Sequence, residues 1–266
     1  MKLLVFVKQV PATEHVKMDD NTGTMIRTDV DAIVNPLDLH AIEEALRVKE
    51  QATGEVDITV ASMGPPNAAD AVREAIAMGC DNGVLISGRE FAGSDTWATA
   101  YTLAGAARAL GPFDLIFCGE RATDGETGQV GPMVGAMMQI PILTYVSRIE
   151  LQDADTLFAH RAIEGGHEVV RCPLPALASV VKEINEPRLP TLAGKIRARH
   201  TEIPVLAAEA IEADPTCLGL NGSPTRVVKI LYPKLTRSGE VLSTETTALE
   251  DCVDRLIAFL RSAQVL

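Results

Sequence analysis

The sequence is poor in aromatic residues, with one Trp, three Tyr and six Phe among 266 residues. This scarcity argues against the aromatic stacking platforms that bind single-stranded nucleic acid. Basic residues are also few, because 24 Lys and Arg stand against 36 Asp and Glu and give a net charge of −12, which leaves no basic face for a nucleic-acid backbone. No apolar run approaches the roughly 18–20 residues of a membrane span, and the N-terminal apolar run is too short for a signal peptide. We therefore expect a soluble, cytoplasmic protein without a nucleic-acid partner and without a membrane span.

Recognisable metal and catalytic motifs are missing as well. The five cysteines lie far apart without a Cys-x-x-Cys pair, and no Cys–His combination has the usual zinc spacing. The P-loop, the Gly-x-Gly-x-x-Gly dinucleotide fingerprint and the Gly-x-Ser-x-Gly elbow are absent. The acidic pair Glu43–Glu44 is expected on the outer, solvated face of a helix rather than as an acid/base dyad. We therefore predict free thiols, no metal site and no catalytic residue, which favours a carrier or binding role.

Short apolar runs alternate with amphipathic stretches over the first half of the chain. Such alternation predicts right-handed crossovers and a mostly parallel sheet with helices on both faces. Four later β-rich runs, separated by turn residues, predict hairpins added at the sheet edge. The predicted strands are Leu3–Val7, Val56–Ala61, Gly83–Ile86 and Asp114–Cys118, the predicted helices are Leu37–Lys49, Asn67–Met78, Thr96–Leu110 and Gly125–Gln139, and the hairpin runs are Leu143–Leu151, Thr156–Ile163, His167–Cys172 and Ala176–Val181.

The pattern changes after Pro187. The stretch Arg188–Lys234 contains several prolines and no long periodic segment, which is typical of a binding arm, and helical spacing returns over Thr247–Ser262. We predict a Rossmann-like α/β domain over residues 1–187 with β-hairpin additions, followed by an extended arm and C-terminal helix over residues 188–266. The start of the arm is a basic strip without acidic residues, able to dock an acidic partner. The strip comprises Arg188, Lys195, Arg197, Arg199 and His200.

The most informative segment follows the fourth predicted strand. In an open parallel sheet, ligands bind beside the loops that leave the carboxyl ends of the strands. The loop Gly119–Val130 carries glycines at 125 and 128, and Gly131 follows it at the expected start of a helix. Free backbone N–H groups and the positive end of that helix would form a phosphate cradle, with Thr127 and Gln129 as further hydrogen-bond partners. On spacing alone, a capped helix with small packing residues is an equally good interpretation.

Six ordered motifs together resemble the beta (small) subunit of electron transfer flavoproteins, over nearly the whole chain. Three positions depart from the family pattern, which has a larger aliphatic residue in place of Ala178 and a basic residue followed by Gln in place of Glu120–Arg121. The motifs are Val7–Pro11, Asn35–Leu46, Met63–Pro65, Asp124–Gln129, Arg161–Glu168 with Pro175–Leu177, and Asn185–Leu192.

The resemblance implies a heterodimer with a larger alpha subunit, which carries electrons between flavin dehydrogenases, such as an acyl-CoA dehydrogenase, and an acceptor. It implies that the redox FAD is held mostly by the alpha subunit. The beta subunit binds AMP in its own sheet in ordinary members, whereas electron-bifurcating members hold a second FAD there that oxidises NADH. Segments after residue 194, Gly222–Thr225 among them, resemble the bifurcating members and favour FAD. The same segment is also a plausible turn and anion nest.

Carried over position by position, the resemblance assigns a nucleotide site and a docking site. Leu192 corresponds to the anchor that the family inserts into the partner dehydrogenase, and Arg188 and Lys195 are expected beside it. The nucleotide site would comprise Phe6, Asn35, Pro36, Leu37, Asp38, Met63, Gly119, Ala122, Thr123, Asp124, Gly125, Glu126, Thr127, Gly128, Gln129 and Val130.

Simpler roles remain open for several of these residues. Asn35 is also suited to cap the helix that follows it, Phe6 and Met63 to pack in the core, and Leu192 to pack on its own domain. Two other functions also stay open. One is an NADH-oxidising bifurcating subunit, and the other is a stand-alone adenine-nucleotide-binding regulator, against which the irregular arm argues.

Overall fold

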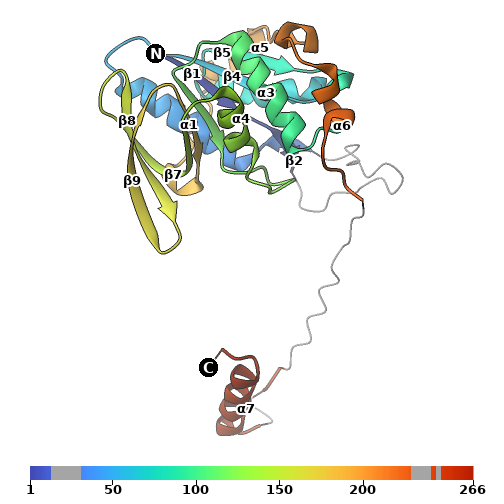
Figure 1. The fold of residues 1–266 in the computed structure, drawn as a ribbon. Coiled ribbons are helices and arrows are strands. Elements are labelled where there is room, and N and C mark those ends of the chain that lie inside the picture. The colour runs from blue at the N-terminus through green and yellow to red at the C-terminus, as the bar shows by residue number, and fades with distance from the viewer. Residues whose placement is uncertain (13–30, 229–240, 244–246, 266) are drawn as a thin grey trace. The chain divides into compact units, whose positions relative to one another are not determined.

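The computed structural model describes residues 1–12, 31–228, 241–243 and 247–265. The chain forms two compact units, Met1–Val228 and Lys229–Leu266. The first unit is built on a nine-stranded sheet with helices on both faces, as Figure 1 shows. This architecture confirms the predicted α/β fold class.

Parallel strands form most of the sheet. Its strands are β1 (Lys2–Phe6), β4 (Asp57–Met63), β5 (Asn82–Ile86), β6 (Leu115–Gly119), β7 (Ile142–Leu151), β8 (Thr156–Ile163), β9 (Gly166–Pro173), β10 (Ala176–Val180) and β11 (Val205–Leu206), and β2 (Gln9–Pro11) pairs with β3 (Ala32–Val34) in a separate ribbon. The order is β11–β5–β4–β1–β6–β10–β7–β8–β9. Neighbours are parallel from β11 to β7 and antiparallel from β7 to β9. The carboxyl ends of the central strands therefore meet at one edge of the sheet.

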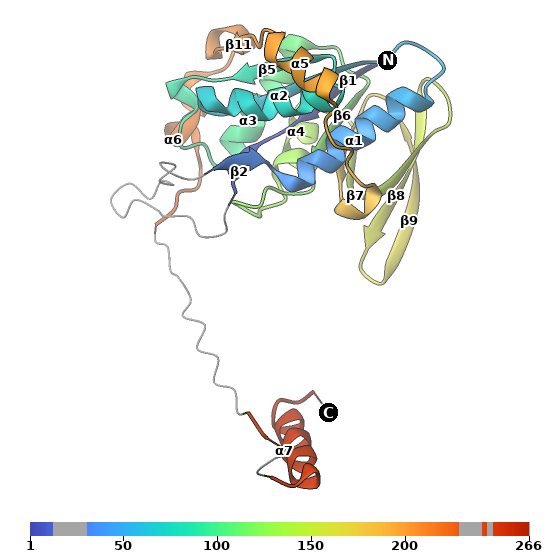
Figure 2. The same ribbon diagram turned by 180° about the vertical axis from the view of Figure 1, so that it is seen from behind.

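Two helical layers enclose the sheet (Figures 1 and 2). The helices of the first unit are α1 (Pro36–Gln51), α2 (Ala69–Met78), α3 (Thr96–Leu110), α4 (Val130–Met138), α5 (Leu192–His200) and α6 (Gly219–Gly222), with 3₁₀ turns at Pro66–Ala68, Arg89–Phe91, Lys182–Ile184, Ala208–Ile211 and Pro215–Cys217, and α7 (Leu249–Ser262) belongs to the second unit. Successive residues of β1 alternate between the layers: Leu3 and Val5 pack with α1 and α2, and Leu4 and Phe6 pack with α3 and α4. Such strands are buried on both faces, which explains their continuous apolar runs.

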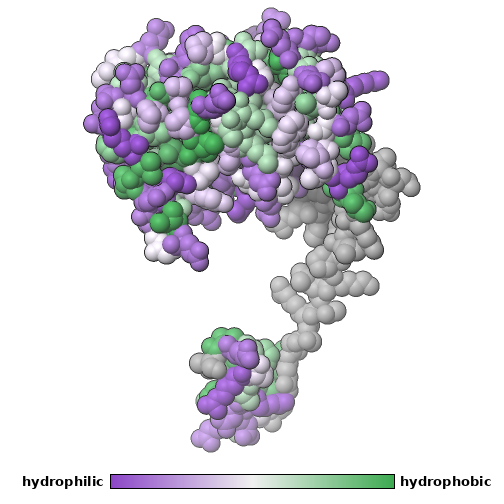
Figure 3. Space-filling model, viewed as in Figure 1, coloured by the Kyte–Doolittle hydropathy of each residue, from purple (hydrophilic) through white to green (hydrophobic). Residues whose placement is uncertain are grey.

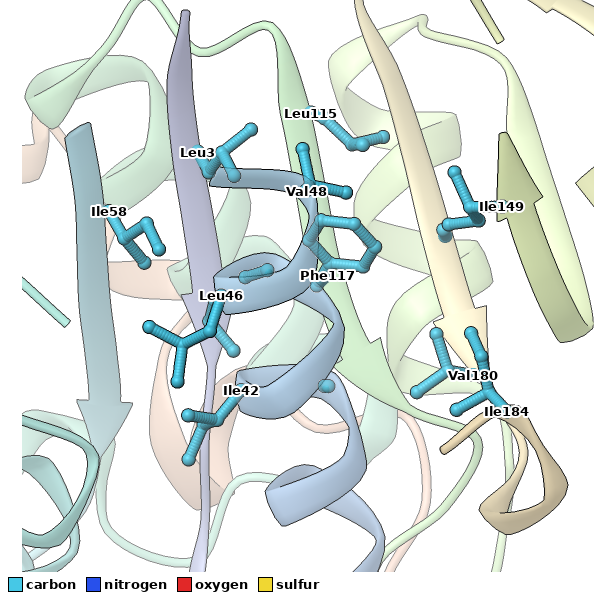
Figure 4. Packing of buried hydrophobic residues seen from close by; sticks show 14 of the residues in the cluster. Leu3, Ile42, Leu46, Val48, Ile58, Leu115, Phe117, Ile149, Val180 and Ile184 are labelled. Atoms are coloured by element: carbon cyan, nitrogen blue, oxygen red, sulfur yellow. The ribbon is translucent and has the colours of Figure 1, made fainter. Parts of the chain in front are cut away.

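The core beneath α1 shows how the sequence builds this packing. Pro36 begins α1, where its fixed φ suits the first helical position. Ile42 and Leu46, one turn apart, then face the sheet above Leu3 and Phe117 (Figure 4). All four of these apolar side chains are buried, so α1 is fixed firmly above the centre of the sheet.

Two predictions about the second half of the first unit are wrong. The run Ala176–Val181 is not an edge hairpin, because β10 lies inside the sheet and pairs in parallel with both β6 and β7. The predicted irregular arm contains a helix, α5, which the sequence conceals through its low apolar content and Gly194. Thr191 caps α5 by accepting a hydrogen bond from the amide of Gly194 at 3.0 Å. Residues 188–228 thus belong to the first compact unit.

The expectation for the acidic pair Glu43–Glu44 is also wrong. Both side chains are buried, with 4% and 6% exposure. The chain that leaves β10 covers them, because Asn185 donates to Glu44 at 3.0 Å and Arg188 donates to Glu43 at 2.7 Å. The amphipathic pattern of α1 could not reveal this, since the covering segment lies about 140 residues further along the chain.

The second unit contributes the helix α7, close to the predicted range Thr247–Ser262. Leu249, Val253 and Leu256 recur at helical spacing and are exposed within this unit. No helix in the described segments combines the length and apolarity that a membrane crossing requires.

Candidate nucleotide-binding site

The predicted cradle residues gather at the carboxyl edge of the sheet. Lys8 follows β1, Met63 ends β4, and the loop of residues 120–129 joins β6 to α4. The start of α1 lies against the same edge, because Asp38 contacts the ends of both β1 and β6. The structure therefore brings together residues that are more than 80 positions apart in the chain.

Asp38 joins the ends of two central strands. Its Oδ2 accepts from the amide of Lys8 at 2.8 Å, and its Oδ1 accepts from the amide of Gly119 at 3.0 Å. The side chain is buried, and burial raises the pKa of Asp38 to about 7, against the opposing effect of these N–H donors. A Cβ on Gly119 would lie 2.6 Å from Asp38 Oδ1, so this strand end requires glycine for the carboxylate to approach.

Asn35 fixes the loop itself. Its side chain is fully buried, its Nδ2 donates to the carbonyl of Arg121 at 2.9 Å, and its Oδ1 accepts from the amide of Thr123 at 3.2 Å. The alternative in which the Asn35 side chain caps α1 is wrong, because no such hydrogen bond forms. The side chain instead secures the loop after β6 to the first turn of α1.

Lys8 provides a third attachment. Its Nζ lies 2.6 Å from Asp124 Oδ1, and the Asp124 side chain is only 7% exposed. Lys8 is not among the site residues predicted from the sequence, although its place just after a buried strand is the signal that could have identified it. The ion pair fastens the middle of the loop to the end of β1.

The helix after this loop begins later than predicted. The sequence predicts Gly125–Gln139, whereas α4 runs from Val130 to Met138. Two residues with left-handed backbone conformation, Glu126 (φ 50°) and Gly128 (φ 63°), keep the segment before Val130 out of the helix. The amides of Gly125 and Glu126 turn back to the carbonyl of Ala122. The segment is therefore a tight loop in front of a helix start.

The N-terminus of α4 lacks an anionic cap. Gln129 occupies the capping position, but its side chain accepts no hydrogen bond from an amide of the first turn, and that turn contains no acidic residue. The amide of Met133 donates to the carbonyl of Gln129 at 3.0 Å as the first helical bond, so the N–H groups of Val130 and Gly131 are left without helical acceptors. These groups and the helix dipole favour an anion at this position.

The neighbouring helix α3 provides a contrast. Asp95 Oδ1 accepts from the amides of Trp97 and Ala98, each at 3.0 Å. Its Oδ2 accepts from Thr225 N at 2.9 Å and Thr225 Oγ1 at 2.7 Å, and the amide of Asp95 donates to Ser223 at 2.8 Å. The plausible nest at Gly222–Thr225 thus receives a carboxylate of the same chain. At α3 the protein supplies its own anion, whereas at α4 it supplies none.

The glycines of the loop and of α4 divide into two roles. A Cβ on Gly131 would lie 2.6 Å from Cys118 Sγ, and one on Gly135 would lie 2.5 Å from Ile142 Cγ1, so both serve close helix–sheet packing. A Cβ on Gly125 would meet no atom within 4 Å, which leaves space for a ligand. The packing interpretation therefore applies to Gly131 and not to Gly125.

The remaining predicted residues surround this arrangement. Phe6 is buried in the core below α3 and α4, and Met63 packs against the same cluster. Thr96, at the start of α3, donates to Gln129 Oε1 at 3.5 Å and so links the two helix starts. The uncapped helix start, the open space at Gly125 and the hydroxyl and amide side chains nearby suit a phosphate group.

A separate hollow of about 460 Å³ lies on β7 and β8, lined by residues that include Tyr145 and Arg161. The Arg161 guanidinium is already bonded to Thr144 O at 2.8 Å, to Thr144 Oγ1 at 2.7 Å and to Glu168. It therefore offers little to an anionic ligand. Among the described residues, no cluster of His, Cys, Asp and Glu has a geometry suited to a metal ion.

The predicted docking residues lie elsewhere, at the start of α5. Leu192 is 77% exposed, so the interpretation that it packs on its own domain is wrong. Lys195 is exposed one turn later. Arg188 contacts Glu43 and Glu50 of α1 instead of projecting freely.

Comparison with known proteins shows the family of the chain. Residues 22–211 match the electron transfer flavoprotein domain. The chain is 42% identical over 267 residues to the electron transfer flavoprotein subunit beta of Thermoanaerobacterium thermosaccharolyticum, and 39% identical over 266 residues to the caffeyl-CoA reductase-Etf complex subunit CarD of Acetobacterium woodii, in both cases over all of each chain. It is also 39% identical to the acryloyl-CoA reductase electron transfer subunit gamma of Anaerotignum propionicum, over 97% of this chain and 98% of that protein.

Proposed function

Since the chain belongs to the electron transfer flavoprotein family as a beta subunit, we propose that it holds an adenine nucleotide at the carboxyl edge of its sheet. The observation that carries the proposal is the uncapped start of α4, which faces a loop that Asn35, Asp38 and Lys8 hold in place. The nucleotide phosphate accepts hydrogen bonds from the amides of Val130 and Gly131.

The remaining cradle residues shape the site around that phosphate. Thr127 and Gln129 offer side-chain hydrogen bonds, and Gly125 and Gly128 allow the ligand to approach the backbone closely. Asn35, Asp38 and Lys8 act through the loop, since their polar side-chain atoms bond to protein groups. This division separates residues that contact the ligand from residues that position the loop.

Two ligands satisfy the same cradle. AMP and FAD share the adenosine and its first phosphate, so the α4 start suits both. The segment around Gly222–Thr225, which resembles that of bifurcating members, favours FAD. A flavin supplies the electron chemistry that no side chain of this chain offers, and with FAD in this site the subunit would take part in NADH oxidation; with AMP, the nucleotide would be structural.

A count of flavin and AMP on the purified heterodimer, released by heat and separated by chromatography, tests the proposal. Two FAD and no AMP per heterodimer would assign FAD to this site. One FAD and one AMP would assign AMP. A heterodimer whose only nucleotide is the FAD of the alpha subunit would contradict the cradle assignment.

The partners follow from the family and from the names of the relatives. We propose that the chain pairs with an electron transfer flavoprotein alpha subunit in the cytoplasm, through the arm after residue 187 and the exposed apolar face of α7, and that the exposed Leu192 at the start of α5 docks with the partner dehydrogenase. Exposed apolar residues also gather over β7–β9 (Figure 3), Ile163 and Val169 among them. The names of two relatives refer to caffeyl-CoA and acryloyl-CoA reductases, which supports a flavin dehydrogenase of CoA thioesters, such as an acyl-CoA dehydrogenase, as the electron partner.

A further inference from the structure

We propose that Arg188 does not contact the partner dehydrogenase but positions the exposed turn Leu189–Leu192 that docks with it. The inference rests on the proposed function, because it assumes that this turn meets a dehydrogenase. Leu189 is 88% exposed and Leu192 is 77% exposed. Two large apolar side chains this exposed, within four residues, mark an interaction surface.

The turn is clamped on its N-terminal side. Arg188 donates from Nε to Glu43 Oε2 at 2.7 Å, from Nη2 to Glu43 Oε1 at 3.0 Å and from its own amide to Glu43 Oε2 at 3.1 Å. It reaches Glu50, two turns further along α1, at 2.5 Å and 3.1 Å. Asn185 adds hydrogen bonds to Glu44 and to the carbonyl of His40, both at 3.0 Å. The segment before Leu189 is thereby fixed to α1.

A second clamp follows the turn. Arg197 of α5 donates to the carbonyls of Ile76 at 2.6 Å and Cys80 at 3.0 Å, at the end of α2. Arg73 of α2 donates to the carbonyls of Ala198 at 2.6 Å and Thr201 at 3.1 Å, at the end of α5. Each arginine satisfies the last carbonyls of the other helix. The turn therefore lies between two anchored points.

The clamps divide the basic strip into two groups. Arg188 and Arg197 are occupied within the chain. Lys195, Arg199 and His200 form no ion pair with any residue that the structure describes. Lys195, Ile196 and Arg199 share one helix face with Leu192, at spacings of three, four and seven residues. The complementary partner surface is an apolar pocket for the leucines with an acidic rim for the free cations.

Preorganisation is the physical benefit of this arrangement. A partner that binds a turn already held in place avoids the entropy cost of ordering it. Loss of the Arg188 clamp should therefore weaken docking without altering the chemistry that follows. Loss of Arg188 and loss of Lys195 each lower the local charge by one unit, so both variants should change the electrostatic steering of association to a similar extent.

The test measures electron transfer from an acyl-CoA dehydrogenase, with its acyl-CoA substrate, to the intact heterodimer. Arg188→Ala is expected to raise the KM for the heterodimer by about tenfold with kcat unchanged, at high as well as at low ionic strength. Lys195→Ala is the matched control: it removes the same charge, so its effect on KM should fade at high ionic strength, where charge steering is screened. Arg188→Lys should restore part of the lost affinity, since it retains one charge beside Glu43.

Three results would overturn the positioning role. The first is an unaltered KM in Arg188→Ala. The second is a rise in KM that disappears at high ionic strength as in Lys195→Ala, which would make Arg188 a direct charge contact. The third is unaltered hydrogen exchange of the amides of Leu189, Thr191 and Leu192 in Arg188→Ala, where the clamp predicts faster exchange than in Lys195→Ala. If Arg188→Ala fails to fold, Glu50→Gln replaces it in the same measurements. This variant removes one of the two carboxylate partners of Arg188 at a side chain that is 57% exposed. An unaltered KM in Leu192→Ala would instead refute the docking function of the turn. The hydrogen-exchange measurement does not depend on docking, so it tests the positioning role separately.

Discussion

Asn35 shows at the scale of one residue how the sequence positions the candidate site. A buried amide offers both a donor and an acceptor, and Asn35 uses both on the backbone of the loop after β6. A carboxylate would lack the donor, and Ser or Thr, the other common residues at a helix start, would be too short to span both contacts. The residue type thus follows from the two opposite backbone groups that it bonds.

Replacement of Asn35 by Ala is expected to release the loop. The variant loses both hydrogen bonds in a buried position, which should lower the unfolding free energy by about 2 kcal/mol. The amount of nucleotide retained per heterodimer should fall together with the unfolding free energy. Thermal unfolding and a nucleotide count measure the two effects. Asn82→Ala, at an exposed asparagine at the opposite end of the sheet, serves as the control and should change neither quantity.

Asp38 predicts a specific pH dependence. Burial raises the pKa of Asp38 from 3.8 to about 7, so the folded chain retains a proton that the unfolded chain releases between these values. The unfolding free energy should therefore fall as pH rises through this window, by at most about 4 kcal/mol, and level off above it. Urea unfolding from about pH 5 to about pH 8 measures the slope.

The variant Asp38→Asn removes this contribution from the slope. Glu44, whose pKa burial also raises, remains in the variant, so the comparison isolates Asp38. Equal slopes in the wild type and in Asp38→Asn would show that the folded chain does not hold the proton on Asp38.

At the scale of elements, glycine serves two different purposes around the start of α4. One glycine allows the helix to pack closely on the sheet, and the other leaves open space in the preceding loop. Gly131 allows α4 to approach Cys118 of β6, whereas Gly125 faces open space in the loop. Sequence spacing alone could not separate these roles, because both glycines precede or begin the same helix. The structure separates them by what a side chain at each position would meet.

A pair of alanine substitutions tests this separation. Gly131→Ala should force α4 away from β6 and lower the unfolding free energy by about 1–3 kcal/mol. Gly125→Ala should leave thermal stability unchanged and still reduce nucleotide retention, because the added methyl group occupies the ligand's approach. Equal retention in Gly125→Ala and the wild type would place the phosphate away from this loop.

Elements could be predicted from the sequence where local pattern and final environment agree. The central strands β1, β4, β5 and β6 are buried on both faces, and their continuous apolar runs predict this burial. The helix α5 has little apolar content of its own, since reciprocal arginine contacts with α2 hold it. The burial of Glu43 likewise depends on Arg188, 145 residues away. Such features arise from tertiary contacts that no local window contains.

At the scale of the whole molecule, the hydrophobic core and the exposed helix α7 belong to different units. The core clusters are formed by residues of Met1–Val228. In the second unit, α7 has no buried residue and carries Leu249, Val253, Leu256 and Phe259 exposed. A helix with an apolar face but no core of its own gains stability by packing against another surface. We infer that the first unit supplies the fold and that α7 supplies affinity for another chain.

Truncation after Val228 tests this division. The shortened chain should keep its thermal unfolding temperature to within about 3 °C, because no residue of the described core is removed. It should keep the nucleotide that the cradle holds, and it should lose stable association with the alpha subunit, measured by gel filtration of the two co-expressed chains. A full-length variant with Leu249, Val253 and Leu256 changed to Ser should show the same loss, whereas Asp251→Ala on the polar side should not. Equimolar co-elution of the truncated chain with the alpha subunit would locate the interface on the first unit alone.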